Sequence, residues 1–110
     1  MLKKNTIILG RDNEVSMNIS FRGKFSGDGL DNFTEIRLNI GGETYSTVDT
    51  PASLLVENGT RLILRIGTVT QLPPGDYRPE VIGINGTYDD GYVLTSPVYN
   101  PIDFIYIKGA

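Results

Sequence analysis

Apolar and polar residues alternate along several short stretches of this chain. The first runs from Glu14 to Phe21, where every second residue is apolar: Val15, Met17, Ile19 and Phe21. The second runs from Phe33 to Ile40, and its apolar positions are Ile36, Leu38 and Ile40. Successive side chains of a strand point to opposite faces, so this period of two predicts strands with one buried and one solvated face.

Turn signals between extended runs predict three hairpins. Gly41-Gly42 precedes the run Glu43–Thr47, and Asn58-Gly59 separates Ser53–Glu57 from Arg61–Gly67, whose Leu62, Leu64 and Ile66 should point inward. The third hairpin joins Tyr77–Asn85 to Gly91–Thr95 through a polar tip, and Ile102–Ile107 forms the last strand. Glycine and asparagine are the residues that tight hairpin turns require.

The stretch Leu72–Tyr77, with sequence LPPGDY, marks a corner at a strand entrance. Pro74 presets the backbone for a turn, Gly75 accepts a positive φ, and Asp76 can bond to nearby backbone. We expect Tyr77 to bury its ring and return its hydroxyl to the preceding loop, as the tyrosine of an immunoglobulin-like corner does.

Strand signals recur about every ten residues, and no stretch keeps apolar residues at helical spacing. Short strands at this spacing are typical of a two-sheet sandwich. The sequence therefore predicts an all-β, immunoglobulin-like antiparallel β-sandwich of about seven or eight strands. We expect one domain over residues 1–110, with residues 1–5 as a flexible N-terminal tail.

The composition excludes most enzyme classes. The chain has no cysteine and no histidine, which removes Ser-His and Cys-His nucleophiles and the usual zinc ligands. We therefore expect a protein that is not an enzyme and has no cofactor.

The net charge argues against nucleic acid as a partner, and the short apolar runs argue against a membrane. Thirteen acidic and ten basic residues give a net charge of −3, which disfavours binding to phosphate backbones. The apolar run Thr6–Gly10 is far too short to span a membrane, and Arg11-Asp12 follow it at once. We expect neither partner.

The two ends of the chain are apolar on both faces of the predicted strands. They contain the candidate interface residues Ile7, Ile8, Leu9, Phe104, Ile105, Tyr106 and Ile107. Burial on two sides would suit such strands. Either loops of the same domain cover them, or they form an edge or patch that pairs with another subunit.

Acidic loops and tyrosines are the remaining candidate binding groups. Asp28 and Asp31, or Asp89 and Asp90 beside Asn85, could supply oxygen ligands to calcium, although turn chemistry explains the same residues. A glycosidase would need two opposed carboxylates in a cleft, which a sandwich this small rarely has. Stacking faces for sugars could come from four tyrosines, although core or rim packing also explains them: Tyr45, Tyr88, Tyr92 and Tyr99.

The order of these features resembles that of a known group of proteins. An alternating strand after Arg11-Asp12 is followed by FTEIRLNIGGETY over residues 33–45, by Leu62-Ile63-Leu64 and by the corner at residues 72–77. This pattern resembles the small immunoglobulin-like structural proteins of tailed bacteriophages, including domains similar to the N-terminal module of baseplate upper proteins. In such proteins one return strand usually follows the corner, whereas here Pro97 and Pro101 interrupt the return and a further strand follows.

The resemblance implies a virion component, made in the cytoplasm of the host bacterium. It would be present in many copies in the head, neck, tail or baseplate and attached through its terminal strands to other virion proteins or to copies of itself. The alternative is a carbohydrate- or calcium-dependent binding module that uses its loops.

Overall fold

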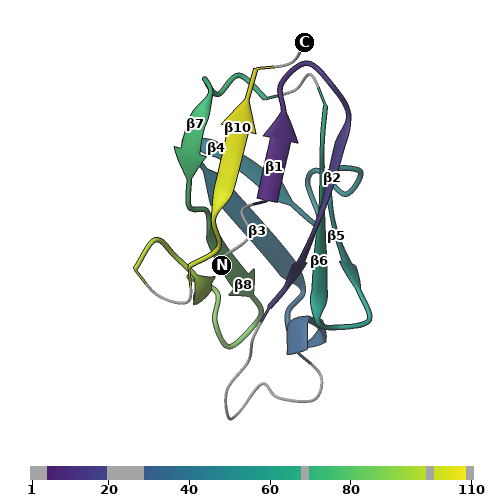
Figure 1. Cartoon of the computed structure of the whole chain (residues 1–110). Helices are drawn as coiled ribbons and strands as arrows, with labels where there is room; N and C mark the ends of the chain where they lie inside the picture. The colour runs from purple at the N-terminus through teal and green to yellow at the C-terminus, as the bar shows by residue number, and fades with distance from the viewer. Residues whose placement is uncertain (1–4, 20–28, 68–69, 99–100, 109–110) are drawn as a thin grey trace.

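The protein is built from short β-strands (Figure 1). A computed structural model describes residues 5–19, 29–67, 70–98 and 101–108. Their strands are β1 (Asn5–Ile8), β2 (Asn13–Asn18), β3 (Glu35–Ile40), β4 (Glu43–Ser46), β5 (Leu54–Glu57), β6 (Arg61–Ile66), β7 (Gly75–Tyr77), β8 (Glu80–Ile84), β9 (Tyr92–Thr95) and β10 (Phe104–Ile107). One 3-10 turn, η2 (Gly29–Asn32), precedes β3. The predicted all-β class is confirmed.

The ten strands of the described residues form three sheets. Their orders are β1-β10-β7, β2-β6-β5 and β4-β3-β8-β9. The prediction of seven or eight strands was therefore too low. The prediction of purely antiparallel pairing was also wrong, because β1 and β10 run parallel. Parallel partners must come from distant parts of the chain, and here they are its two ends.

The alternating stretches have the buried and solvated faces that their pattern predicts. On β2, Val15 and Met17 are buried while Glu14, Ser16 and Asn18 are exposed. On β3 and β6 the predicted inward residues are at most 1% exposed: Ile36, Leu38, Ile40, Leu62, Leu64 and Ile66. Phe21 lies outside the described residues.

Two of the predicted hairpins turn at residues with positive φ. Gly41 and Gly42, between β3 and β4, have φ of 56° and 88°. Asn58 and Gly59, between β5 and β6, have φ of 56° and 71°. This backbone region costs glycine little and tolerates asparagine better than most residues, so the turn residues fix both hairpins.

The predicted strand Tyr77–Asn85 is divided in two. Its first residue ends β7, which pairs with β10, and its later part is β8, which pairs with β3 and β9. The division falls at Arg78-Pro79. Proline has no backbone N–H to donate to a ladder, so the strand is interrupted where Pro79 lies.

The corner has the predicted hydrogen bond. The Tyr77 hydroxyl donates to the carbonyl oxygen of Pro73 at 2.6 Å, and Gly75 has a φ of 154° that a residue with a Cβ rarely adopts. The half-buried ring of Tyr77 packs on Tyr106, with ring centroids 4.9 Å apart. The corner after Pro74 therefore fastens β7 to β10.

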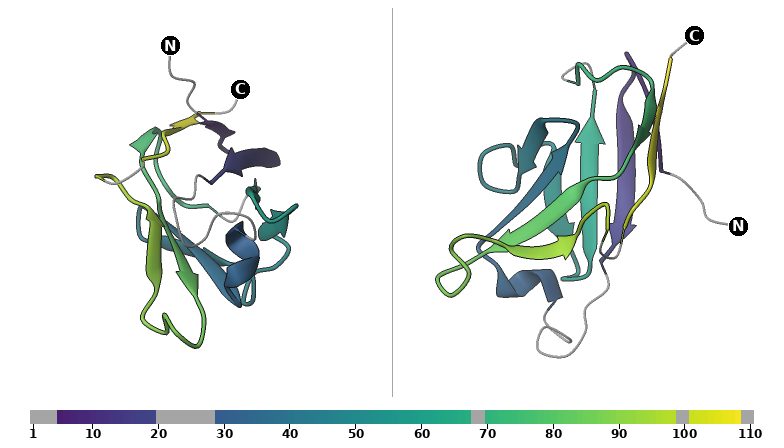
Figure 2. Two further views of the ribbon diagram at one scale, coloured as in Figure 1. Left: turned by 90° about the horizontal axis from the view of Figure 1, so that it is seen from below. Right: turned by 90° about the vertical axis from the view of Figure 1, so that its left-hand side faces the viewer.

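All three sheets contribute to one core, and Figure 2 shows them arranged around it. Ile7, Phe104 and Tyr106 enter from the sheet that contains both terminal strands, Val15 and Leu64 from the second sheet. The N-terminal strand starts at Asn5, within the predicted tail, and residues 1–4 lie outside the described residues. Both terminal strands, β1 and β10, are thus part of the packed structure.

Candidate interaction surface

The first and last strands lie side by side in one sheet, β1-β10-β7, here called the terminal sheet (Figure 1). Ile8 pairs with Ile107 and Thr6 with Ile105, while Ile105 also pairs with Asp76 on β7. Residues that pair across a ladder share a face. These five side chains therefore form the outward face of the terminal sheet.

The predicted interface residues divide between the two faces of this sheet. Ile7, Phe104 and Tyr106 are at most 1% exposed and belong to the core, whereas Ile8 and Ile107 are 40% and 39% exposed. Ile105 is half-buried, and Leu9 is half-buried against the core. Burial of these strands is thus one-sided, contrary to the two-sided burial that their sequence suggested. An interface in the folded protein would use Ile8, Ile105 and Ile107.

The edge of β1 is occupied by a side chain. Asn13 Oδ1 accepts from the backbone N–H of Ile8 at 2.9 Å, and Asn13 Nδ2 donates to the Ile8 carbonyl at 3.0 Å. The same amide nitrogen also donates to the carbonyl oxygens of Arg11 and Ile66. Asn13 therefore takes the place of a neighbouring strand at Ile8, and it ties β1 to β2 and β6.

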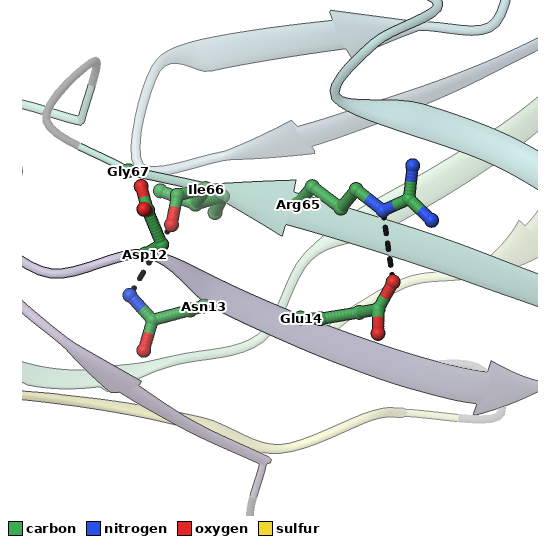
Figure 3. Close-up of a pocket in the computed structure, with 6 residues that line it drawn as sticks. All are labelled: Asp12, Asn13, Glu14, Arg65, Ile66 and Gly67. Atoms are coloured by element: carbon green, nitrogen blue, oxygen red, sulfur yellow. Dashed lines mark hydrogen bonds and ion pairs between the residues drawn. The ribbon is translucent and has the colours of Figure 1, made fainter.

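A hollow of about 400 Å³ lies beside Asn13 at one end of β2 and β6 (Figure 3). It is lined by Asp12, Asn13, Glu14, Arg65, Ile66 and Gly67. Glu14 and Arg65 reach toward each other across the two strands and form an ion pair at 2.8 Å, with both side chains more than half exposed. An exposed pair of this kind contributes little stability, and the hollow is open to solvent.

A second hollow, of about 500 Å³, adjoins the terminal sheet. It is lined by Asp76, Tyr77, Arg78, Pro97 and Asp103. Arg78 Nε donates to Asp103 Oδ1 at 2.6 Å, so these two charges compensate each other. Asp76 also lines this hollow and is exposed.

A half-buried polar cluster centred on Glu43 lies near Tyr106 and was not predicted. The hydroxyls of Tyr45 and Thr70 donate to Glu43 Oε1 at 3.2 and 2.7 Å, and the Gln71 N–H donates to Glu43 Oε2 at 2.7 Å. The Tyr106 hydroxyl is buried and has no hydrogen-bond partner among the described residues. An unpaired buried hydroxyl is destabilising.

The environment of this cluster raises the pKa of both tyrosines. Burial, aided by the Glu43 carboxylate, raises the pKa of Tyr45 to about 12. Burial also raises the pKa of Tyr106, with smaller contributions from Tyr45 and Glu43, while the Thr70 hydroxyl opposes the increase. Both phenols are therefore neutral at physiological pH and serve as packing groups.

The acidic loops show turn chemistry. Asn85 Oδ1 accepts from the backbone N–H groups of Thr87 and Tyr88 at 2.9 and 2.8 Å, and Asn85 Nδ2 donates to the carbonyl of Asn32. Asp31, Asp89 and Asp90 are exposed, and Asp28 lies outside the described residues. Within the described ranges, no cluster of three or more Asp or Glu side chains could hold a metal ion.

The four candidate stacking tyrosines lie in different settings. Tyr45 is 6% exposed and cannot offer a face to a sugar. Tyr88 and Tyr92 pack edge to face at 5.1 Å, and Tyr92 remains 37% exposed. Tyr99 lies outside the described residues. Sugar binding at the Tyr88 and Tyr92 tip stays a prediction.

In the part of the chain that the structure describes, no helix has the length and apolar character needed to cross a membrane. No family model matches this sequence, and no curated protein matches it.

Proposed function

We propose that this chain is a non-enzymatic structural protein of a tailed-bacteriophage particle that assembles in many copies through the outward face of its terminal sheet. The observation that carries the proposal is the adjacent pair of Ile8 and Ile107, each about two-fifths exposed on neighbouring strands. Contiguous exposed apolar side chains are typical of contact sites for other proteins.

The same proposal includes an immunoglobulin-like sandwich. Only Arg78-Pro79 separates β7 from β8, and β10 follows β9 as their partner on the return. The terminal sheet and β4-β3-β8-β9 would then be two halves of one interrupted sheet that faces β2-β6-β5. The hydrogen bond from Tyr77 to Pro73 supports this arrangement, because a tyrosine corner is typical of such domains.

The contact would use the face of the terminal sheet. Addition of a foreign strand to β1 requires free backbone groups at its edge, and at Ile8 both groups are bonded to Asn13. The face retains partly exposed apolar side chains. A partner that packs on the face gains their remaining burial without displacing Asn13.

The contact should be weak for a single copy and effective in an array. Full burial of an isoleucine contributes about 1.5–3 kcal/mol, and Ile8 and Ile107 are already about three-fifths buried. Such a contact alone gives a low affinity, whereas many linked contacts in one particle multiply it. A weak contact that is repeated suits a building block.

The native mass of the purified protein tests the proposal. Sedimentation equilibrium over micromolar to millimolar concentration should show self-association that the double variant Ile8→Ser with Ile107→Ser removes. Substitutions are preferable to removal of residues 101–110, because that truncation also deletes Phe104 and Tyr106 from the core.

Val48→Ser is the matched control, since Val48 is 59% exposed but lies in the loop after β4. It should associate as the unchanged protein does. A protein that stays monomeric over the whole concentration range would contradict self-assembly through this face. The same would follow if the control and the double variant were equally affected.

A further inference from the structure

We propose that Asn58 is a site of spontaneous deamidation, at which water converts the side-chain amide to an acid, while the same tripeptide at Asn85 is protected by the fold. The sequence Asn-Gly-Thr occurs at residues 58–60 and again at residues 85–87. A difference in reactivity between the two copies must therefore come mainly from the folded structure. The inference is independent of the proposed function, because neither tripeptide belongs to the terminal sheet.

The reaction begins at the backbone nitrogen that follows the asparagine. This nitrogen loses its proton to solvent and attacks Cγ of the side chain, the bond from Cγ to the amide nitrogen breaks, and ammonia leaves. Water then opens the resulting cyclic imide at either of its carbonyl carbons. One opening gives aspartate, and the other gives isoaspartate, in which the main chain continues through Cγ. Glycine favours the attack because it has no Cβ beside the reacting nitrogen.

Asn58 is exposed in the turn between β5 and β6, and within the described residues its side chain has no hydrogen-bond partner. The turn is anchored through carbonyl groups, since Leu30 N–H donates to Gly59 O at 2.6 Å and Ile19 N–H donates to Thr60 O at 3.0 Å. Neither bond involves the two reacting atoms, Asn58 Cγ and Gly59 N. A local opening of the hairpin end brings them together, and it relieves the φ of 56° that is unfavourable for a residue with a Cβ.

Asn85 has the same residues after it, but its side chain is held at both ends. Its Oδ1 accepts from the backbone N–H groups of Thr87 and Tyr88, and its Nδ2 donates to the carbonyl of Asn32 at 2.9 Å. These three bonds must be disrupted before Cγ can approach the nitrogen of Gly86. The attack at Asn85 should therefore be at least about tenfold slower than the attack in the turn between β5 and β6.

Deamidation changes both the charge and the backbone of the turn. Either product adds a carboxylate next to Glu57, which forms an ion pair with Arg61 at 2.8 Å. Isoaspartate also lengthens the main chain between residues 58 and 59 by a carbon atom. A hairpin turn sets the register of its strands, and this register places Leu62 and Leu64 in the core. The isoaspartate form should therefore be less stable than the original protein.

Peptide mapping by mass spectrometry tests the inference. The folded protein is incubated at mildly alkaline pH in water enriched in heavy oxygen, and samples are digested at intervals. The peptide that contains residue 58 should gain the mass of an acid in place of an amide, with heavy oxygen incorporated, and should separate into aspartate and isoaspartate forms. The peptide that contains residue 85 should react at least about tenfold more slowly.

The urea-unfolded protein is the matched control, since unfolding removes the hydrogen bonds that hold Asn85. In urea the two tripeptides should react at similar rates. Asn58→Gln should abolish the reaction at residue 58, because the longer side chain closes a larger ring much less readily. Asn58→Asp adds the charge without the change in the backbone, so it separates the effects of the two products on stability.

Three results would overturn the inference: equal rates at the two sites of the folded protein, a faster reaction at Asn85, or reaction of both sites in urea with none at Asn58 in the folded protein. Urea unfolding of the incubated protein measures the structural effect. Its midpoint should lie below that of fresh protein and below that of the Asn58→Asp variant. Equal midpoints would overturn the predicted loss of stability.

Discussion

The outward faces of two sheets in this molecule differ in their chemistry. On β2-β6-β5, ion pairs link Glu14 with Arg65 and Glu57 with Arg61, each at 2.8 Å and with side chains about half exposed. On the terminal sheet, Ile8 and Ile107 occupy neighbouring outward positions. The first face thus carries charged pairs, with the buried Ile63 between Arg61 and Arg65 along β6, whereas the second carries two exposed isoleucines side by side.

The inner faces of the same two sheets differ as well. The β2-β6-β5 sheet contributes aliphatic side chains and one methionine to the core: Val15, Met17, Leu54, Leu62, Leu64 and Ile66. The terminal sheet contributes Ile7, Phe104 and Tyr106, and the hydroxyl of Tyr106 is buried beside Glu43 and Tyr45. The terminal sheet thus has a polar hydroxyl on its inner face and exposed apolar side chains on its outer face.

The largest expected effect separates the two faces of β10. Phe104→Ala should lower the free energy of unfolding by about 3–5 kcal/mol, because it leaves a cavity in the core. Ile107→Ala should lower it by less than about 1 kcal/mol, since the side chain is partly exposed. Urea unfolding followed by circular dichroism measures both. Equal losses would contradict the assignment of inward and outward residues.

An intermediate effect is expected at alkaline pH. The folded-state pKa of Tyr45 is about 12, against 10 for an ordinary tyrosine, and burial raises the pKa of Tyr106 in the same direction. The unfolded chain loses these protons first, so the stability that they contribute is complete below pH 10. It falls as the pH rises from 10 through 12, by at most about 1.4 kcal/mol per pH unit for each tyrosine.

Urea unfolding at successive pH values between 9 and 12 measures this decline. Tyr45→Phe is the matched variant, because it keeps the ring and removes one of the two titrating groups. Its stability should decrease less steeply with pH than that of the unchanged protein. A slope that is the same in both proteins would show that Tyr45 does not titrate as its burial requires.

The smallest effect is expected on the face with ion pairs. Glu14→Gln removes the carboxylate that binds Arg65, and both side chains are more than half exposed. The loss should be about 0–1 kcal/mol and should disappear in high salt. Urea unfolding at two ionic strengths measures it. A loss that high salt leaves unchanged would indicate that Glu14 contributes to packing more than to charge pairing.

Local patterns in the sequence predicted the local structure well. The alternation at Val15 and Met17 predicted which face of β2 is buried, because successive side chains of a strand point to opposite faces of the sheet. Asn58-Gly59 and Gly41-Gly42 predicted their turns, since few residues tolerate positive φ. The hydroxyl of Tyr77 reaches Pro73 across four residues, so the corner was also within reach of a local argument.

Contacts between distant segments were not predictable in this way. The parallel pairing of Asn5–Ile8 with Phe104–Ile107 joins the two ends of the chain, and the cluster of Glu43, Thr70 and Tyr106 gathers three separate segments. Periodicity says which side of a strand is apolar but does not say which strand lies beside it. The one-sided burial of the terminal strands could only emerge from that pairing.

The amide of Asn13 has a consequence for how large an assembly can become. A sheet edge that accepts a strand usually presents a fresh edge to the next molecule, so growth by that route has no natural end and leads to fibres. At Ile8 that route is closed within the molecule itself. Contacts made through a face, by contrast, are satisfied once the face is covered. If the chain assembles in many copies, as proposed, this favours addition of copies to a closed structure over growth into an open one.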